Sequence, residues 1–194
     1  MQRPAQAVTG SRLTKYMVES SDIEQLKKDL FSDDWKLMQA SSEQLRDIGG
    51  EEVFHFFIDC LDLGNSRNRT RNIAALRLKE IGDNRALEPL LAAILKKENI
   101  NYNGTLVYAL SGLDCTHKLC ELFEMLFYHG YEAKLGAYNI ISEQIFEFTR
   151  QDILSIASEW EDLKKTPERC PAFNDAKALI EDCVQGFLPY LDQS

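Results

Sequence analysis

Residues 71–97, RNIAALRLKEIGDNRALEPLLAAILKK, constrain the fold more than any other stretch, because two apolar-patterned runs flank a short break. The second run repeats apolar residues at the i, i+3, i+4, i+7 and i+8 spacing of one helix face, with Leu87, Leu90, Leu91, Ile94 and Leu95. In the break, Gly82 suits a helix C-terminus because glycine tolerates positive φ. Asp83 and Asn84 can accept hydrogen bonds from the next helix's free N–H groups. The stretch predicts two helices joined by a tight turn.

This helix pair recurs along the chain. A shift of 33 residues toward the N-terminus aligns Leu78, Ile81, Gly82 and Leu90 with Leu45, Ile48, Gly49 and Phe57. A shift of 32 residues the other way aligns Leu78, Ile81, Leu90 and Ile94 with Leu110, Leu113, Leu122 and Leu126, and a second shift of 32 places Leu154 under Leu122. One helix pair cannot bury its apolar face alone, so this periodicity predicts a solenoid. We expect the second helices, at 51–61, 85–97, 115–128 and 150–164, to form one layer.

The repeat resembles HEAT-like repeats of the bilin-lyase type. The residues that match the pattern of that family are Arg71, Ala74, Ala75, Ile81, Gly82, Asp83, Ala86, Leu90 and Leu91. The resemblance covers residues 33–165. It implies a right-handed stack of helix pairs in which the second helix of each pair lines a concave face. It implies no particular reaction, because this is a repeat family.

The predicted fold class is therefore all-α, a short right-handed HEAT-like α-solenoid forming a single domain over residues 1–194. Residues 1–32 are expected to form N-terminal cap helices, 33–165 about four repeats, and 166–194 a C-terminal cap helix, since a short solenoid needs closing elements. Ser21 with Glu24 is a candidate capping box. Ser32 is a candidate cap for the helix that follows it.

Composition favours a soluble globular protein. Hydrophobic residues make up 44% of the 194 and charged residues 27%. The most apolar stretch, EVFHFFIDCLDL, is too short to span a bilayer. No apolar signal segment precedes it. The five cysteines lack disulfide-framework spacing, and most lie on predicted apolar faces, so we expect reduced thiols and a cytoplasmic location without a membrane partner.

Cys115, His117 and Cys120 are three potential metal ligands within six residues. Their C-x-H-x-x-C spacing is unusual for zinc, and no further Cys or His obviously completes a set of four. An alternative interpretation makes Asp114 or Thr116 a helix cap and Cys120 an apolar filler. Catalysis by Cys120 with His117 is disfavoured because Glu121 and Glu124 would raise the thiol pKa.

Other enzyme signatures are absent from the sequence. It contains no phosphate loop, nucleophile elbow or dinucleotide fingerprint. The paired His-Glu motifs of the iron hydroxylase in the HEAT-like family are also missing. We expect no catalytic site, no metal and no cofactor.

Arg67, Arg69 and Arg71 concentrate positive charge in NSRNRTRN. They could clamp a phosphate. Alternatively, one is the arginine of the repeat pattern and the rest belong to a solvated loop. A net charge of −9 and a pI near 4.9 argue against nucleic acid, whose binding depends on basic surface. We expect no nucleic-acid partner.

The outward positions of the predicted second helices carry more carboxylates than ammonium groups. This is either an ordinary solvated face or a surface for a basic protein. The candidate partner-binding residues are His55, Asp59, Glu88, Glu121, Glu124, Tyr128, Asp152 and Glu159.

The leading functional hypothesis is a non-catalytic protein-binding module that holds a basic partner on an acidic concave face. A short acidic repeat protein of this kind resembles bacterial immunity proteins, which neutralise cognate toxins, many of them basic nucleases. The alternative is a bilin-lyase-like chaperone or enzyme subunit that binds a small conjugated ligand. That alternative predicts an apolar pocket with a free cysteine or an aromatic lining.

Overall fold

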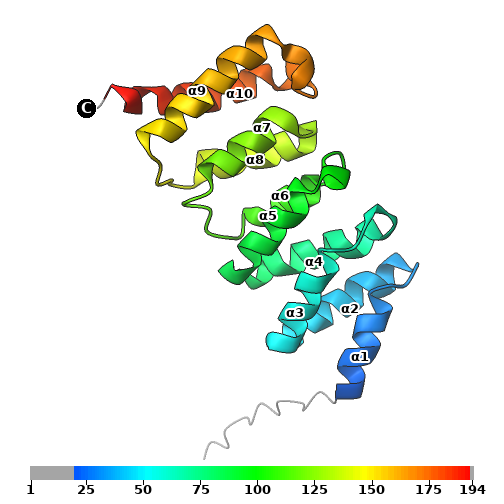
Figure 1. Cartoon of the computed structure of the whole chain (residues 1–194). Coiled ribbons are helices and arrows are strands. Elements are labelled where there is room, and N and C mark those ends of the chain that lie inside the picture. The colour runs from blue at the N-terminus through cyan, green and yellow to red at the C-terminus, as the bar shows by residue number, and fades with distance from the viewer. Residues whose placement is uncertain (1–19, 193–194) are drawn as a thin grey trace, which may run out of the picture.

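The computed structural model describes residues 20–192, and that part of the chain is helical without any β-strand. Figure 1 shows the helices stacked into an elongated body, with the two ends of the described chain at opposite ends of the stack. The α-helices are α1 (Ser20–Asp29), α2 (Trp35–Ile48), α3 (Glu51–Cys60), α4 (Asn68–Ile81), α5 (Leu87–Leu95), α6 (Gly104–Leu110), α7 (Leu119–Tyr128), α8 (Tyr131–Glu143), α9 (Arg150–Lys165) and α10 (Phe173–Phe187). Short 3-10 helices lie between some of them and after the last one; these are η1 (Asn65–Arg67), η2 (Asn84–Ala86), η3 (Lys97–Asn99), η4 (Pro167–Arg169) and η5 (Leu188–Leu191).

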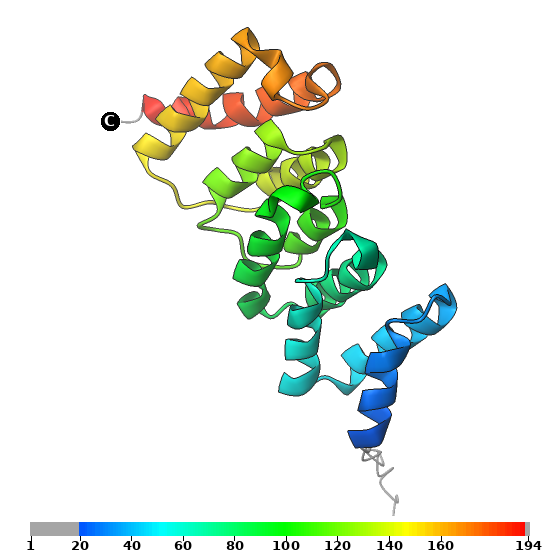
Figure 2. The ribbon, with the colours of Figure 1, turned by 45° about the vertical axis from the view of Figure 1, so that its right-hand side comes forward.

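The helices after α1 form two rows. In the first-helix row, α2, α4, α6, α8 and α10 each pack against the next. In the second-helix row, α3, α5, α7 and α9 lie along the other side of the stack (Figure 2). The predicted second helices are therefore all present, although α5 and α7 begin later than expected, at Leu87 and Leu119.

The turn between α4 and α5 has the predicted chemistry at Gly82 and Asp83, whereas the prediction for Asn84 is wrong, because its Oδ1 accepts from the backbone N–H of Asp114 in the next unit. Gly82 is left-handed, with φ 68° and ψ 19°, and its N–H donates to the Leu78 carbonyl, which closes the end of α4. The Asp83 carboxylate then accepts from the backbone N–H of Arg85 at 3.0 Å. The short break between the two apolar runs thus ends one helix and starts the next.

A glycine allows two neighbouring helices of the first-helix row, α6 and α8, to approach closely. A Cβ added at Gly136 on α8 would lie 3.0 Å from Cγ1 of Val107 on α6. The absence of a side chain at this position therefore sets the spacing between α6 and α8.

The apolar core follows the predicted register through three units. Leu90 and Leu122 are fully buried, as are Leu45, Leu78 and Leu110. In the fourth unit the register is wrong: Leu154 is 38% exposed, whereas its neighbour Ile153 is buried together with Ile156. The buried position is taken by Ile153, 31 rather than 32 positions after Leu122, and one residue of error turns a helical position by about 100°.

The predicted caps near the N-terminus are also wrong. Asp34, not Ser32, caps α2, because its carboxylate accepts from Lys36 N at 2.9 Å. Ser32 instead accepts from the backbone N–H of Asp34. Ser21 lies inside α1, which begins one residue earlier. Residues 1–19 of the expected N-terminal cap, and 193–194 of the C-terminal one, lie outside the described part of the chain.

Between Ser20 and Asp192, no helix has both the length and the apolar character that crossing a bilayer requires.

Candidate protein-interaction surface

The two rows differ in charge, and the second-helix row is the acidic one. The sequences of α3, α5 and α7 contain no lysine or arginine at all. With α9 included, the acidic residues of this row are Glu51, Glu52, Asp59, Glu88, Glu121, Glu124, Asp152, Glu159, Glu161 and Asp162, against the basic residues Arg150, Lys164 and Lys165. The first-helix row carries acidic and basic residues in equal number. The acidic excess is therefore larger on the second-helix row, although Lys27, Arg85 and Lys118, which lie outside these helices, form ion pairs with Glu52, Glu51 and Glu88.

Four of the predicted site residues are exposed on this row. His55 and Asp59 are exposed one helical turn apart on α3. Glu88 is exposed on α5, and Glu124 is exposed on α7. Each helix turns its opposite side, with residues such as Phe57 or Leu122, into the core. The amphipathic pattern thus presents these side chains outward.

The other predicted residues are half-buried and already engaged. The Tyr128 hydroxyl donates to the Glu159 carboxylate, and Arg169 donates to both, at 3.2 Å to Tyr128 Oη and 3.0 Å to Glu159 Oε1. Partial burial and the Glu159 contact raise the pKa of Tyr128 to about 12. Asp152 forms a capping box with Thr149 at the start of α9, and these hydrogen bonds lower the pKa of its carboxyl.

Lys118 neutralises part of the predicted acidic surface. It lies in the turn before α7, with its Nζ 2.6 Å from Glu88 Oε1 and 3.4 Å from Glu121 Oε1. Sequence reasoning missed this bridge, because Glu88 and Lys118 are 30 positions apart and only the stacking of units brings them together. Among residues 20–192, Asp59 and Glu124 are the predicted carboxylates that take part in no ion pair and no helix cap.

Arg71 is not part of a solvated loop. It is fully buried, donates to the Asn99 side chain, and reaches the Tyr102 carbonyl at 3.0 Å. Asn99 in turn donates to the Ala93 carbonyl near the end of α5. Arg71 is therefore a structural link between units, and only Arg67 and Arg69 of the three arginines are exposed.

The Cys115, His117 and Cys120 side chains face different surroundings. Cys115 is buried with its Sγ 3.7 Å from the Leu110 carbonyl, whereas His117 is exposed beside Glu147. Cys120 is exposed, so the prediction that it fills an apolar gap is wrong. The predicted helix cap is also wrong: Asp114 accepts from the backbone N–H of Thr116 within a turn, and α7 begins after Lys118 without a side-chain cap. Partial burial and the nearby Asp152 raise the pKa of Cys120 to about 11, which disfavours the reactive thiolate. No group of three or more metal-ligating side chains occurs between residues 20 and 192.

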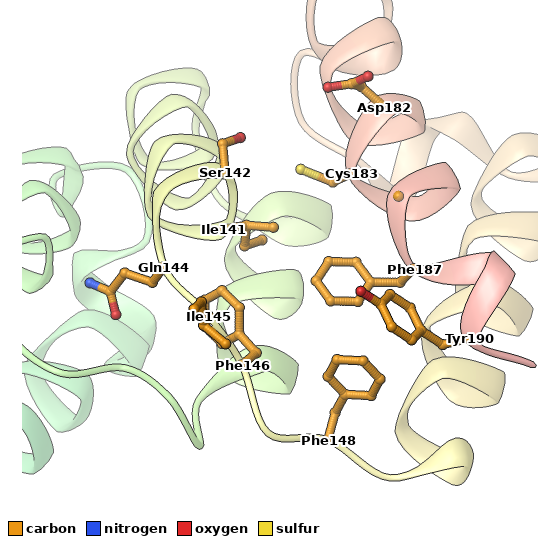
Figure 3. Close-up of a pocket in the computed structure, with 11 residues that line it drawn as sticks. Ile141, Ser142, Gln144, Ile145, Phe146, Phe148, Asp182, Cys183, Phe187 and Tyr190 are labelled. Carbon is orange, nitrogen blue, oxygen red and sulfur yellow. The ribbon is translucent and has the colours of Figure 1, made fainter. Parts of the chain in front are cut away.

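An aromatic pocket lies where the α8–α9 connection meets the end of α10 (Figure 3). It has a volume of about 430 Å³, and its aromatic walls are Phe146, Phe148, Phe187 and Tyr190. The Phe148 ring meets Phe187 and Tyr190 edge-to-face, at 5.3 and 5.2 Å between centroids. The buried thiol of Cys183 also lines it, and the Asp182 carboxylate, which accepts from the Tyr138 hydroxyl at 3.1 Å, lies at its edge.

Sequence reasoning did not find this pocket, because its walls come from segments some forty residues apart. The one local signal was Ile145 and Phe146, two large apolar residues in a connection between helices. Ile145 is 87% exposed.

No protein-family model matches the chain, and a search of curated proteins finds no match. The resemblance to HEAT-like repeats therefore stays a prediction, and the candidate surfaces are interpreted from their own chemistry.

Proposed function

We propose that this protein is a non-catalytic binding module, a short right-handed HEAT-like α-solenoid whose second-helix row forms a concave face for a basic partner protein. The observation that carries the proposal is the separation of charge between the two rows. The four second helices carry ten acidic residues against three basic ones, whereas the first-helix row carries eight of each. Three cations of the first-helix row are buried, so its surface is also acidic, but by a smaller excess.

The exposed carboxylates of the second-helix row contribute little to folding, and their energetics suit the binding of a partner. Exposed carboxylates such as Asp59 and Glu124 are solvated in the free protein, so they cost little. Opposite a basic surface they gain Coulomb energy in a partly desolvated interface, and the field of the whole row speeds encounter with that surface. Glu88 and Glu121 can exchange Lys118 for a partner cation, because exposed ion pairs contribute only about 0–1 kcal/mol.

The partner class that fits is a basic protein such as a nuclease-type toxin, with this chain acting in the cytoplasm as its immunity protein. An acidic inhibitor of matching shape masks the cationic groups with which a nuclease holds phosphates. His55 and Tyr128 would supply flat contacts between the carboxylates, with Asp152 and Glu159 at the end of the row.

A matched pair of charge reversals tests the proposal. Glu121→Lys with Glu124→Lys changes the second-helix row, and Glu143→Lys with Asp175→Lys makes the same net change on the first-helix row. The immobilised wild-type protein is used to capture the partner, which is then identified and purified. The association rate and affinity of the partner for the wild type and each variant are measured at several salt concentrations. We expect the first pair to weaken binding at least tenfold and to flatten its salt dependence, whereas the second pair has a small effect. Equal effects of the two pairs would reject the second-helix row as the contact.

The aromatic pocket supports a second candidate function, the binding of a small planar conjugated ligand. This alternative predicted an apolar pocket with a free cysteine or an aromatic lining; the pocket has both, and its volume lies within the range of ligand sites. Protein purified from its native host should then carry an absorbance band beyond 300 nm or a co-purifying small molecule. Tyr190→Ala should remove it, and Tyr102→Ala, at a similarly exposed tyrosine far along the chain, should not. Colourless, ligand-free native protein would reject this candidate.

A further inference from the structure

The connection between α8 and α9 is held in place although it has no helical structure. The Gln144 side chain accepts from the backbone N–H of Cys115 at 2.9 Å and donates to the Leu113 carbonyl at 2.9 Å. The backbone N–H of Glu147 donates to the Thr116 carbonyl at 2.9 Å. These hydrogen bonds fix the connection to the turn that precedes α7. The aromatic pocket, one wall of which this connection forms, is therefore present before anything binds.

The same connection exposes a large apolar side chain at the pocket. Ile145 is 87% exposed, the highest value among the exposed large hydrophobic side chains of residues 20–192. It lines the pocket with Phe148, Phe187 and Tyr190, whose rings face one another in Figure 3. Exposed apolar surface of this kind marks contact sites, because water is released from both surfaces when a partner covers them.

The chain around the pocket is acidic. The segments 141–150 and 181–192 supply its walls, and they contain five carboxylates against the single cation Arg150: Glu143, Glu147, Glu181, Asp182 and Asp192. Lys177, the next cation along α10, lies more than one helical turn before Asp182. A cationic occupant therefore gains Coulomb energy here. A second copy of this chain is disfavoured, because it brings the same carboxylates.

The pocket adjoins the end of the second-helix row. Phe148 lies four positions before Asp152, a candidate partner-binding residue in the first turn of α9. Thr116, which holds the connection, lies just before α7, the helix that carries Glu121 and Glu124. A protein that covers the end of this row therefore reaches the pocket as well.

We propose that the aromatic pocket receives one large apolar side chain of the basic partner, a phenylalanine, tryptophan or leucine with lysine or arginine on either side. This inference rests on the proposed function, from which it takes the partner's positive charge. Phe148, Phe187 and Tyr190 surround the inserted side chain, and Ile145 packs against the adjoining backbone of the partner. The carboxylates around the pocket pair with the flanking cations. A few buried side chains of this kind carry most of the binding energy of an interface.

A selection from random peptides tests the chemistry of the occupant directly. A phage-displayed library of random dodecapeptides is panned on the immobilised full-length wild-type protein and, separately, on Tyr190→Ala. We expect the peptides enriched on the wild type to share one large apolar residue with lysine or arginine close on both sides. The same peptides should not be enriched on Tyr190→Ala. Failure to enrich any peptide, enrichment of peptides without cations, or equal enrichment on both proteins would overturn the proposal.

Fluorescence anisotropy with the most enriched peptide, labelled and synthesised, then locates its contact. Ile145→Ser changes a side chain that is almost wholly in solvent, so the fold is preserved, and it should weaken binding at least fivefold. Leu135→Ser is the matched control at an exposed aliphatic position on α8, and it should have little effect. Alanine in place of the apolar residue of the peptide should weaken binding at least tenfold. Equal affinities of the two protein variants would place the peptide elsewhere and reject the pocket.

Kinetics with the captured basic partner separate this inference from the proposed function. Ile145→Ser should speed dissociation and leave the salt dependence of association unchanged, whereas the reversal of Glu121 and Glu124 slows association. An effect of the charge reversal without any effect of Ile145→Ser would overturn the pocket and leave the proposed function standing. A partner that ignores both changes would overturn both proposals. Self-association in sedimentation that Ile145→Ser abolishes would make a second copy the occupant and reject the inference.

Discussion

The first-helix row buries three of its eight cations, whereas the second-helix row buries none of its charged side chains. Arg71 and Arg77 on α4 and Lys134 on α8 are the buried charged side chains of residues 20–192, and all three belong to the first-helix row. Burial of a polar group costs free energy unless it is hydrogen-bonded. Lys134 binds carbonyls at the end of α7, and Arg71 reaches the end of α5 through Asn99. Lys134 and Arg71 thus help to hold second helices in place, whereas Arg77 donates to Glu80 of its own helix.

Leucine truncation on the inward side of the second-helix row should have the largest effect. Leu90→Ala or Leu122→Ala should reduce the free energy of unfolding by about 2–5 kcal/mol, because each leaves a cavity in a fully buried position. Leu154→Ala is the matched control on α9, and it should cost under about 1 kcal/mol because this side chain is partly in solvent. Urea titration measures all three. An equal loss of stability for Leu154→Ala and Leu122→Ala would mean that Leu154 occupies the buried position that the sequence predicted for it.

Arg71→Ala should be the most damaging polar substitution of the first-helix row. It leaves the Asn99 side chain and the Tyr102 carbonyl without their buried donor, at a cost of about 3 kcal/mol. Arg69→Ala, two residues earlier on α4 and exposed, should change stability by less than about 0.5 kcal/mol. Similar values for the two, from the same urea titrations, would mean that burial of Arg71 contributes nothing.

The sequence allowed prediction of what depends on local pattern. Apolar periodicity located all four second helices, and Gly82 with Asp83 located the turn. It also placed Leu90 and Leu122 in the core. Local pattern does not determine what lies opposite a side chain in the next unit. The burial of Arg71, the bridge from Lys118 to Glu88 and the walls of the aromatic pocket all depend on contacts between segments some 30 or more residues apart.

Acid should loosen the junction between the rows through His129. This histidine follows α7, is buried, and its Nδ1 lies 2.8 Å from Nδ2 of Asn103 at the start of α6. Burial, with a further contribution from Lys134, lowers its pKa from 6.5 to about 4. As pH falls below 6.5 the unfolded chain binds a proton that the folded chain does not accept until about pH 4, so stability is lost across that window. The loss at this site should be roughly 3 kcal/mol.

Comparison with a variant isolates this contribution, since carboxylates with lowered pKa values also lose stability in acid. His129→Leu cannot titrate at this position. Urea titrations at pH 7 and pH 4.5 should therefore show a smaller drop for the variant than for the wild type. Equal drops would assign the acid sensitivity to the carboxylates alone.

The smallest change in stability should come from removing Lys118, a cation that screens carboxylates of α5 and α7 in the second-helix row. Lys118→Met breaks two partly exposed ion pairs, with Glu88 and Glu121, and should cost less than about 1 kcal/mol. It leaves both carboxylates uncompensated, so the basic partner should associate faster at low salt.

Lys79→Met is the matched control on the first-helix row: it removes the same charge from beside the Tyr108 ring, where Lys79 Nζ lies 3.5 Å from the ring centroid. An equal acceleration by both variants would reflect net charge alone. Slower association for Lys118→Met would mean that the lysine, rather than the carboxylates around it, contacts the partner, and the second-helix row would then lose its role as an acidic surface.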